Sequence, residues 1–414
     1  MIMNDSNHHL RRGAALLCLL LLCGANDAAA GAAPVVSNVR AAQRSGTSYV
    51  DITYDLADAD SSSLTVAVGV STNAGTTWFY PGTSLTGAVG SGIAPGAGKQ
   101  SAWNAGSDLP AKLFANVRIQ VTADDATAPG GMALIPAGSF TMGNCMGSSD
   151  GYTSELPLHS VYVSAFYMDK YPVTKSLWDE VYNWATSHGY TFDYAGSGKA
   201  STHPVQTIDW YDCVKWCNAR SEKEGRVPAY YTDAGLSVRY RSGQVGPYVN
   251  WSSGYRLPTE AEWEKVARGG VSGHRFPWSD SDNIDWSRAN YYVYRSAATN
   301  YYAYDVNGTS GYNPAWTGGG SPYTTAVGTF AANGYGLYDM AGNVWQWCWD
   351  WWGSYSSGSQ TDPRGATSGS RRVLRGGSWS YNAYGCRAAG RNTRSYPDSG
   401  GHDMGFRSAL PTGQ

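Results

Sequence analysis

The sequence predicts an α+β fold in two parts, an N-terminal β-sandwich and a larger domain with little regular secondary structure. Its 414 residues are enough for two to three domains of roughly 100–200 residues each. Residues 34–125 contain segments that alternate between apolar and polar side chains, which is typical of half-buried strands. The chain also holds 51 Gly, 30 Tyr and 17 Trp but only 8 Phe, which favours a loop-rich scaffold with polar-tipped aromatic side chains.

The charge balance limits the kind of partner. The 30 Lys+Arg and 32 Asp+Glu residues nearly cancel, for a net charge of −2. Because binding to nucleic acid needs a clustered basic surface, we expect no nucleic-acid partner. The hydrophobic fraction of 42% is enough to bury a core, which excludes wholesale disorder.

Residues 1–30 have the pattern of a secretory signal peptide. The basic stretch HHLRR (8–12) precedes an uncharged run (13–25) and the small-residue sequence AAA (28–30). The run is too short to span a membrane, and no second hydrophobic run follows, so we expect no transmembrane segment and a secreted, periplasmic or cell-surface protein. A lipoprotein acylated at Cys23 is less favoured, since Leu22 stands where such signals have a small residue.

The first folded module is expected at residues 34–125. Its strand-like segments include VDITY (50–54), LTVAV (64–68) and VRIQV (117–121). About 90 residues suit a seven-strand immunoglobulin-like sandwich. The module has no His and no Cys, which favours a spacer or adhesion role, and the Gly/Pro-rich residues 126–131 are the expected linker.

Two helices of the larger domain (132–414) have clear N-terminal signals. Thr259 and Glu262 form a capping box, and Gly269-Gly270 is expected to end that helix. Asp209 can cap a second helix, on which Cys213 and Cys217 share one face. Five tryptophans further along the chain are expected to form the aromatic floor of the domain: Trp345, Trp347, Trp349, Trp351 and Trp352.

A series of ordered motifs in this domain resembles one family. The series comprises MALIPAGSFTMG (132–143), HPVQTIDWYDCVKWCN (203–218), YRLPTEAEWEKVARGG (255–270), NGYGLYDMAGNVWQW (333–347), RVLRGGSW (372–379) and GFR (405–407). In this order the motifs are similar to those of the formylglycine-generating enzyme, or sulfatase-modifying factor, family. The resemblance implies a variant of the C-type-lectin fold.

The resemblance also implies a test for oxidase activity. The family's oxidases use two cysteines just after the GGS-aromatic motif to bind copper and convert a substrate cysteine to formylglycine with oxygen. Here that segment retains only Cys386, with Tyr381 and Asn382 near the expected first thiol. Because Cu(I) prefers paired soft thiolates, an oxidase with Cys386, Ser378 and Trp345 in its site is the alternative function and not the preferred one.

Calcium sites are a second implication of the resemblance. The family's first site maps onto Asp339, the carbonyls of Gly342 and Val344, and Gln346. Asp339 is a good oxygen ligand, whereas the neutral Gln346 lowers the charge of the site. A second site would use Asn290 and the carbonyl of Tyr291, without an identified carboxylate.

The cysteines leave their pairing open. Outside the signal peptide the chain has Cys145, Cys213, Cys217, Cys348 and Cys386. An odd number in an oxidising compartment requires at least one free or intermolecularly linked thiol, with either structural thiols or one or two disulfides among the rest. Their spacing is not that of a zinc site, and the few histidines, with no H-x-x-x-H pair, do not favour non-haem iron.

The C-terminal segment favours a binding role. Between residues 379 and 405 a frame of Trp379, Arg387, Arg391 and Pro397 is interleaved with small polar residues and Tyr. The pattern resembles the variable region of retroelement-diversified proteins, whose lectin-like fold displays an adaptable binding surface. We therefore expect the lectin-like face to bind a protein or cell-surface ligand. The expected contact residues are Trp379, Tyr381, Tyr384, Asn392, Tyr396 and Asp403.

Overall fold

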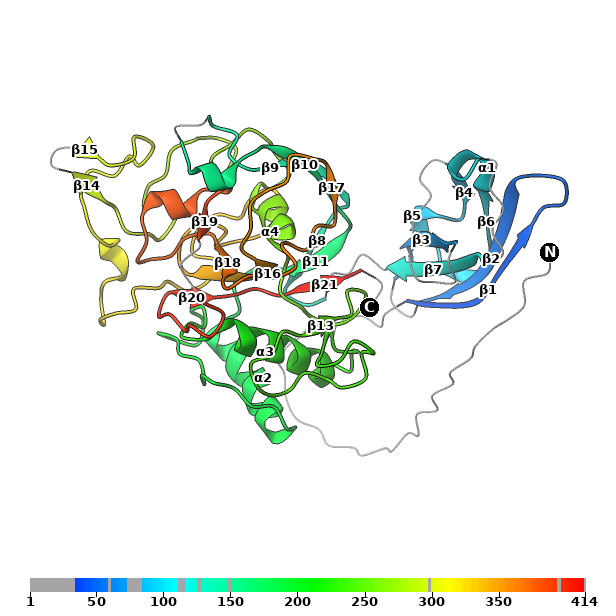
Figure 1. Ribbon diagram of the computed structural model, residues 1–414, viewed down its shortest axis with the longest axis horizontal. Helices are drawn as coiled ribbons and strands as arrows, with labels where there is room; N and C mark the ends of the chain where they lie inside the picture. Colours follow the sequence, from blue (N-terminus) through cyan, green and yellow to red (C-terminus); the bar gives the residue numbers. More distant parts are fainter. Residues whose placement is uncertain are drawn as a thin grey trace. The chain divides into compact units, whose positions relative to one another are not determined.

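The computed structural model describes residues 34–58, 61–72, 84–110, 116–124, 129–147, 150–296, 299–392 and 396–412 (Figure 1). The chain divides into two compact units, with the boundary between Thr127 and Ala128. The predicted signal peptide and residues 126–128 of the predicted linker lie outside the described residues. No helix among the described residues has the length and apolar character needed to cross a membrane.

Unit 1 consists of two antiparallel sheets around one core. The first sheet has the order β1 (Val35–Gln43), β2 (Tyr49–Ala57), β6 (Gly96–Asn104), β4 (Leu85–Gly87), and the second the order β5 (Gly90–Ile93), β3 (Leu64–Ser71), β7 (Arg118–Asp124). A short helix, α1 (Ala105–Asp108), follows β6. Alternate residues of β2 and β3 point inward: Ile52, Tyr54, Leu56, Leu64, Val66, Val68 and Val70. The alternation in the sequence is thus the pleat of strands buried on one face.

Unit 2 is mostly loop, with short strands and three helices of eight or more residues among those described. The helices are α2 (Lys175–Ser187), α3 (Trp210–Lys223) and α4 (Glu260–Ala267), with 3-10 turns at Thr153–Glu155, Pro314–Trp316 and Ala383–Cys386. The strands before residue 300 are β8 (Met132–Ile135), β9 (Gly138–Met142), β10 (His159–Val163), β11 (Phe166–Asp169), β12 (Tyr230–Tyr231), β13 (Tyr248–Val249), β14 (Arg295–Ser296) and β15 (Thr299–Asn300). Those after it are β16 (Trp345–Trp351), β17 (Gln360–Thr361), β18 (Arg372–Arg375), β19 (Arg391–Asn392), β20 (Met404–Gly405) and β21 (Ala409–Pro411).

The caps of α3 and α4 are those that the sequence predicts, whereas Thr174, which caps α2, was not predicted. The Thr259 side chain accepts a hydrogen bond from the Glu262 amide, and Glu262 accepts one from the Thr259 amide, so the capping box is present. Gly269 and Gly270 follow α4 with φ of +58° and +83°, a region that glycine adopts without strain. Asp209 caps α3 by accepting from the Asp212 amide at 2.7 Å.

One mixed sheet brings distant motifs together in unit 2. Its order is β19-β18-β16-β20, with β16 antiparallel to β18 and parallel to β20. The predicted aromatic floor is divided: Trp345 and Trp347 lie in one core cluster, whereas Trp352 packs on another. Trp345 and Trp347 lie two positions apart on β16 and so share a face of the strand, whereas Trp352 follows the end of the strand.

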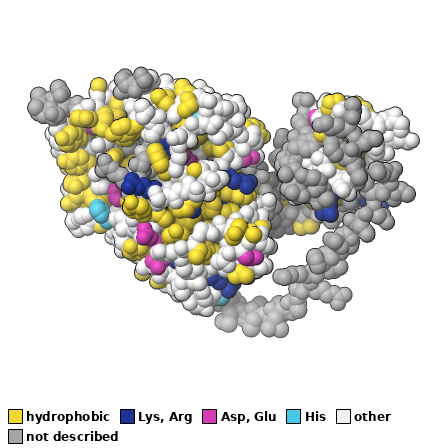
Figure 2. Space-filling view, in the orientation of Figure 1, with side chains coloured by type: hydrophobic (Ala, Val, Ile, Leu, Met, Phe, Trp, Pro, Cys, Tyr) yellow, Lys and Arg dark blue, Asp and Glu magenta, His cyan; other side chains and the backbone are white. Residues whose placement is uncertain are grey.

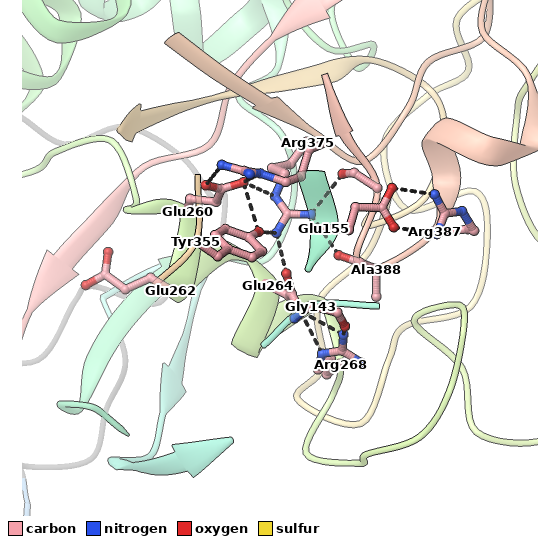
Figure 3. A network of polar contacts seen from close by, with 12 residues as sticks. Gly143, Glu155, Glu260, Glu262, Glu264, Arg268, Tyr355, Arg375, Arg387 and Ala388 are labelled. Carbon is pink, nitrogen blue, oxygen red and sulfur yellow. Dashed lines mark hydrogen bonds and ion pairs between the residues drawn. The ribbon is translucent and has the colours of Figure 1, made fainter. Parts of the chain in front are cut away.

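Buried ion pairs hold the C-terminal segment against the rest of unit 2 (Figure 3). Arg387 contacts both carboxylate oxygens of Glu155 at 2.6 and 2.8 Å, and Arg391 contacts both oxygens of Glu260 at 2.6 and 2.8 Å. Arg375 pairs with Glu264 and Glu260, and Figure 3 shows its guanidinium between them. Each of these side chains is nearly inaccessible to solvent. An ion pair with two hydrogen bonds fixes the orientation of the guanidinium and also neutralises its charge. The C-terminal segment is therefore held in one defined position.

Candidate ligand-binding site

The thiol that an oxidase would require is enclosed. Cys386 lies in the 3-10 turn Ala383–Cys386, fully buried among apolar side chains, and burial raises the pKa of its thiol far above the ordinary value. Its Sγ is so close beneath Gly377 that a Cβ added there would lie 2.8 Å from the sulfur. Because only the thiolate is a good nucleophile or copper ligand, Cys386 is held in its inert form.

Among the described residues, no second thiol accompanies Cys386. All five cysteines outside the predicted signal peptide are free thiols, so the disulfide alternative is not realised. Cys213 and Cys217 lie in one core cluster and Cys348 in another, whereas Cys386 belongs to a third. Cys145 contacts the His274 carbonyl and Arg268. The paired soft ligands of a copper site are therefore absent among the described residues around Cys386.

Hydroxyl groups and a carboxylate stand near the GGS motif instead. The Oγ atoms of Ser378 and Ser380 both donate to Asp403 Oδ2, at 2.8 and 2.6 Å. The Asp403 carbonyl accepts from the Trp345 amide, which ties this loop to β16. Trp345 in turn packs edge-on against Tyr381, with ring centroids 5.1 Å apart.

Aromatic rings from three segments gather around Trp379. The Trp379 ring contacts Tyr312, Tyr323 and His402 at centroid distances of 5.5, 5.2 and 5.3 Å. Tyr292 contacts Tyr312, and its amide donates to the Tyr381 carbonyl. We call this set the aromatic surface: Tyr292, Tyr312, Tyr323, Trp379, Tyr381 and His402. Tyr312 is 39% exposed, and broad hydrophobic patches are visible on the face of unit 2 in Figure 2.

The structure separates the six predicted contact residues. Trp379, Tyr381 and Asp403 lie together, and Tyr381 and Asp403 are half-buried. Tyr384 is buried and donates to Glu155 at 2.6 Å, while Asn392 is buried in β19. Tyr384 and Asn392 are therefore not part of an accessible binding surface, and Trp379, which is buried as well, can only support the more exposed rings around it. Tyr396 is 50% exposed and packs against Arg371.

The predicted frame of the C-terminal segment is mostly internal. Trp379, Arg387 and Arg391 are buried, and the Pro397 carbonyl accepts from the Trp210 amide at the start of α3. Most interleaved residues that the structure describes are half-buried or exposed, namely Ser380, Tyr381, Asn382, Tyr396, Asp398, Ser399, Gly400, Gly401, His402 and Asp403. Changes at such positions alter the surface and leave the packing of the frame intact.

The first predicted calcium site does not fit at Gln346. Its Oε1 accepts from Trp263 Nε1 at 2.8 Å and Arg407 Nε at 2.7 Å, and its Nε2 donates to the Asp339 carbonyl at 2.8 Å. Both lone pairs of the carboxamide oxygen, the atom that would bind a cation, are thereby used within the protein. The Asp339 carboxylate accepts from the Gly328 amide, and burial raises the pKa of this carboxyl group.

The second predicted calcium set lies beside the first. Asn290 pairs with Gly342 through an isolated bridge, and the Val344 side chain is fully buried close by in the sequence. Asn290 Nδ2 donates to the Tyr323 carbonyl at 2.7 Å, and the Tyr291 carbonyl accepts from Trp286 Nε1 at 3.1 Å. The Trp286 indole thus already donates to the Tyr291 carbonyl, whereas the Asn290 contact uses its amide nitrogen and not its oxygen. The engaged Gln346 oxygen does not fit the first calcium site, and the second site stays a prediction.

Sequence reasoning missed four of the six residues of the aromatic surface, namely Tyr292, Tyr312, Tyr323 and His402. Tyr292, Tyr312 and Tyr323 belong to a stretch (291–323) rich in Tyr, Asn and Gly. Its density of tyrosines was the available signal, because such residues are enriched at recognition surfaces. Without the fold, nothing in the sequence places this stretch against Trp379.

The chain is similar to proteins of known name. The sequence model of the sulfatase-modifying factor enzyme 1-like domain matches residues 119–411. The formylglycine-generating enzyme of Mus musculus is 34% identical over 312 residues, which cover 68% of this chain and 76% of the mouse protein. That of Thermomonospora curvata is 33% identical over 306 residues, or 67% of this chain and 93% of the relative.

A solved structure with a similar fold supports the same relationship. Treponema denticola variable protein 1 superposes with a TM-score of 0.51 at 27% identity, covering 70% of this chain and 96% of that chain. The matched segment contains unit 2 with its ordered motifs, its capped helices and its GGS loop. The chain therefore belongs to the formylglycine-generating enzyme, or sulfatase-modifying factor, family.

Proposed function

We propose that this protein is an exported, ligand-binding member of its family and that it does not act as the copper oxidase. The observation that carries the proposal is the state of Cys386, a single thiol that is fully buried and has no thiol neighbour. The aromatic surface, with the adjoining Ser378, Ser380 and Asp403, is the binding site for a protein or cell-surface ligand. Unit 1 serves as an immunoglobulin-like spacer or adhesion module.

The chemistry of the aromatic surface suits recognition. Tyr and Trp rings offer large contact areas with little loss of conformational entropy, and Ser, Gly and Asn provide adaptable hydrogen bonds. Here the rings pack on one another, so their positions are set before a ligand arrives. A preformed surface loses less entropy on binding.

Diversification of the C-terminal segment is part of the proposal. Support comes from the buried frame with accessible interleaved residues, and from the likeness to a solved protein described as variable. On this proposal, substitutions at exposed positions such as His402 change the ligand without changing the fold.

The deciding experiment measures copper binding and oxygen-dependent turnover. Purified protein is incubated with Cu(I), oxygen and a peptide that carries the cysteine motif of a sulfatase. We expect no formylglycine product and no stoichiometric copper, with Cys386→Ser indistinguishable from the wild type. Formylglycine formed by the wild type and lost in Cys386→Ser would establish the alternative, a formylglycine-generating oxidase.

Binding is tested on a peptide selected against the wild-type protein from a displayed library. Tyr312→Ala with Tyr381→Ala should weaken its affinity at least tenfold, because truncated aromatic hot spots cost about 2 kcal/mol or more. Tyr396→Ala is the matched control, since Tyr396 is exposed but lies outside the aromatic surface. Equal losses in both variants would contradict the placement of the site.

A further inference from the structure

A pocket elsewhere in unit 2 has features of a second binding site. Its volume is about 120 Å³, and it lies between the β10–β11 turn, the start of α4 and the loop after β17. The residues that line it include the apolar Pro363 and Pro411, together with Val163 and Phe166, which are themselves almost fully buried. None of the residues of the aromatic surface or the GGS loop lines it.

Arg364 brings a cation without an anionic partner to this pocket. Its guanidinium lies 4.2 Å from the centroid of the Trp251 ring. Within the described part of the chain it forms neither an ion pair nor a hydrogen bond. Partial burial and the charge of Arg256 lower the pKa of Arg364. Its hydrogen-bond donors are therefore open to a ligand.

Arg256 supplies a second cation beside the same indole ring. It is 5% exposed, and its guanidinium lies 5.2 Å from the Trp251 centroid. Its two Nη atoms bind Glu262 at 2.6 and 2.7 Å, but the buried Nε has no partner. A buried donor without an acceptor destabilises the fold, and a suitable acceptor would remove that cost.

The two carboxylates of the pocket are already engaged. Both oxygens of Asp362 accept from Ser164, one from its amide and one from its hydroxyl, each at 2.7 Å. Glu262 accepts from Arg256 and from the Thr259 amide. Asp362 holds this position with φ of +44°, a conformation unusual for a residue with a side chain. The acidic groups shape the pocket but do not neutralise Arg364 through a direct contact.

We propose that this pocket binds a carboxylate on a short apolar stem, with the carboxylate on Arg364 and the stem between Trp251 and the apolar walls. A guanidinium presents paired donors that match a planar carboxylate. The four charged side chains of the pocket, Arg256, Arg364, Glu262 and Asp362, sum to zero. This balance favours a monoanion over a doubly charged phosphate. The carboxylate comes from a free short-chain acid or from the end of an apolar peptide.

Ligand-observed saturation-transfer NMR on the full chain tests the site. The probes are butyrate, butyramide, inorganic phosphate monitored by ³¹P, and a leucine-terminated tripeptide with a free or an amidated C-terminus. We expect millimolar binding of butyrate, and binding at least tenfold weaker for butyramide and phosphate. Tighter binding of the free-acid peptide than of butyrate identifies a peptide end as the source, and the reverse order identifies the free acid.

Matched variants locate the binding. Arg364→Gln should weaken butyrate binding at least tenfold, and Arg364→Lys should restore part of it. Arg288→Gln is the control, because Arg288 also packs on a tryptophan beside a pocket but is neutralised by Asp280 at 2.8 Å. The proposal is overturned if the wild type does not bind butyrate, if butyramide binds equally well, or if Arg364→Gln binds like the wild type.

Discussion

At the scale of single residues, the charged side chains of unit 2 are internal to an unusual degree. Glu155 is fully buried and accepts three hydrogen bonds, from Tyr384 and from both Nη atoms of Arg387. A buried ion pair adds little net stability, but losing one partner leaves an uncompensated charge in the interior. Glu155 is therefore more sensitive to substitution than an exposed glutamate.

Replacing Glu155 by Gln should lower the free energy of unfolding of unit 2 by roughly 3–5 kcal/mol, since Arg387 would remain charged and buried. Urea denaturation measures the change. Tyr384→Phe, which removes only one hydrogen bond to the same carboxylate, should cost about 1 kcal/mol. Similar losses in the two variants would show that the charge pair is not the dominant interaction.

Calcium removal gives a second prediction at this scale. Because Gln346 and Asn290 already contact the protein's own groups, EGTA should leave the unfolding temperature unchanged. Addition of millimolar calcium should likewise have no effect, because a ligand stabilises only when it binds the folded state. Calorimetry with and without EGTA makes the comparison, and a rise in unfolding temperature with calcium would restore the predicted site.

The residue scale also shows a limit of sequence reasoning. Tyr384 and Tyr381 have the same side chain and lie one helical turn apart, yet one binds Glu155 inside the core and the other faces Trp345. The sequence could not distinguish them, because their surroundings come from segments up to 229 positions away. By contrast, the lack of a second soft ligand near Cys386 could be seen directly in the sequence of the segment that follows the GGS motif.

At the scale of elements, the N-terminus of α3 has a costly arrangement of charge. Burial, and then the negative charge of Asp212, raise the pKa of the capping Asp209 to about 7 from its ordinary 3.8. A carboxyl group whose pKa is higher in the folded state destabilises the fold increasingly as pH rises from about 4 to 7. The cap is retained despite this cost because it satisfies the Asp212 amide.

Asp209→Asn should therefore stabilise unit 2 at pH 8 by roughly 1–4 kcal/mol and have little effect near pH 3, where Asp209 is largely protonated in both states. Asn caps helices as well as Asp does, so the hydrogen bond to the Asp212 amide is kept. Urea midpoints at the two pH values test this. Asp209→Ala, which also removes the cap, is the control, and an Asn variant with equal effects at both pH values would refute the electrostatic account.

Elements with local signals were predicted, and those without were not. The Thr259–Glu262 capping box and the Asp209 cap each join residues that are three positions apart. Because such signals are local, α3 and α4 could be placed from the sequence. Strands of two to four residues such as β19 and β20 carry too little periodicity to identify. Their pairing with β18 and β16 depends on long-range packing. The position of the GGS loop depends on the same packing.

At the scale of the whole molecule, the two units have separate cores. Every buried cluster of the described residues belongs to one unit alone. The order of motifs predicted the family fold of unit 2, while alternation predicted the strands of unit 1. The aromatic surface around Trp379 could not be predicted from the sequence, because it forms only when three segments that are distant in the sequence come together.

Separate cores predict two unfolding transitions in calorimetry. Trp103→Ala removes a fully buried ring from the core of unit 1 and should destabilise one transition by roughly 3–5 kcal/mol without moving the other. Trp263→Ala, in a core of unit 2, should act on the second transition alone. A single transition displaced by both substitutions would mean that the units unfold together.

The buried ion pairs of unit 2 have a consequence for biosynthesis. The ion-pair partners Arg387 and Arg391 lie 232 and 131 positions after Glu155 and Glu260, and Ser408, which donates a hydrogen bond to the ion-paired Asp169, lies 239 positions after it. The ribosome makes these partners long after the acidic residues, so unit 2 cannot complete its interior until Ser408 has been translated. A product that is truncated or frameshifted after residue 376 lacks these partners and cannot fold. Folding of unit 2 therefore requires that the C-terminal segment is translated in frame.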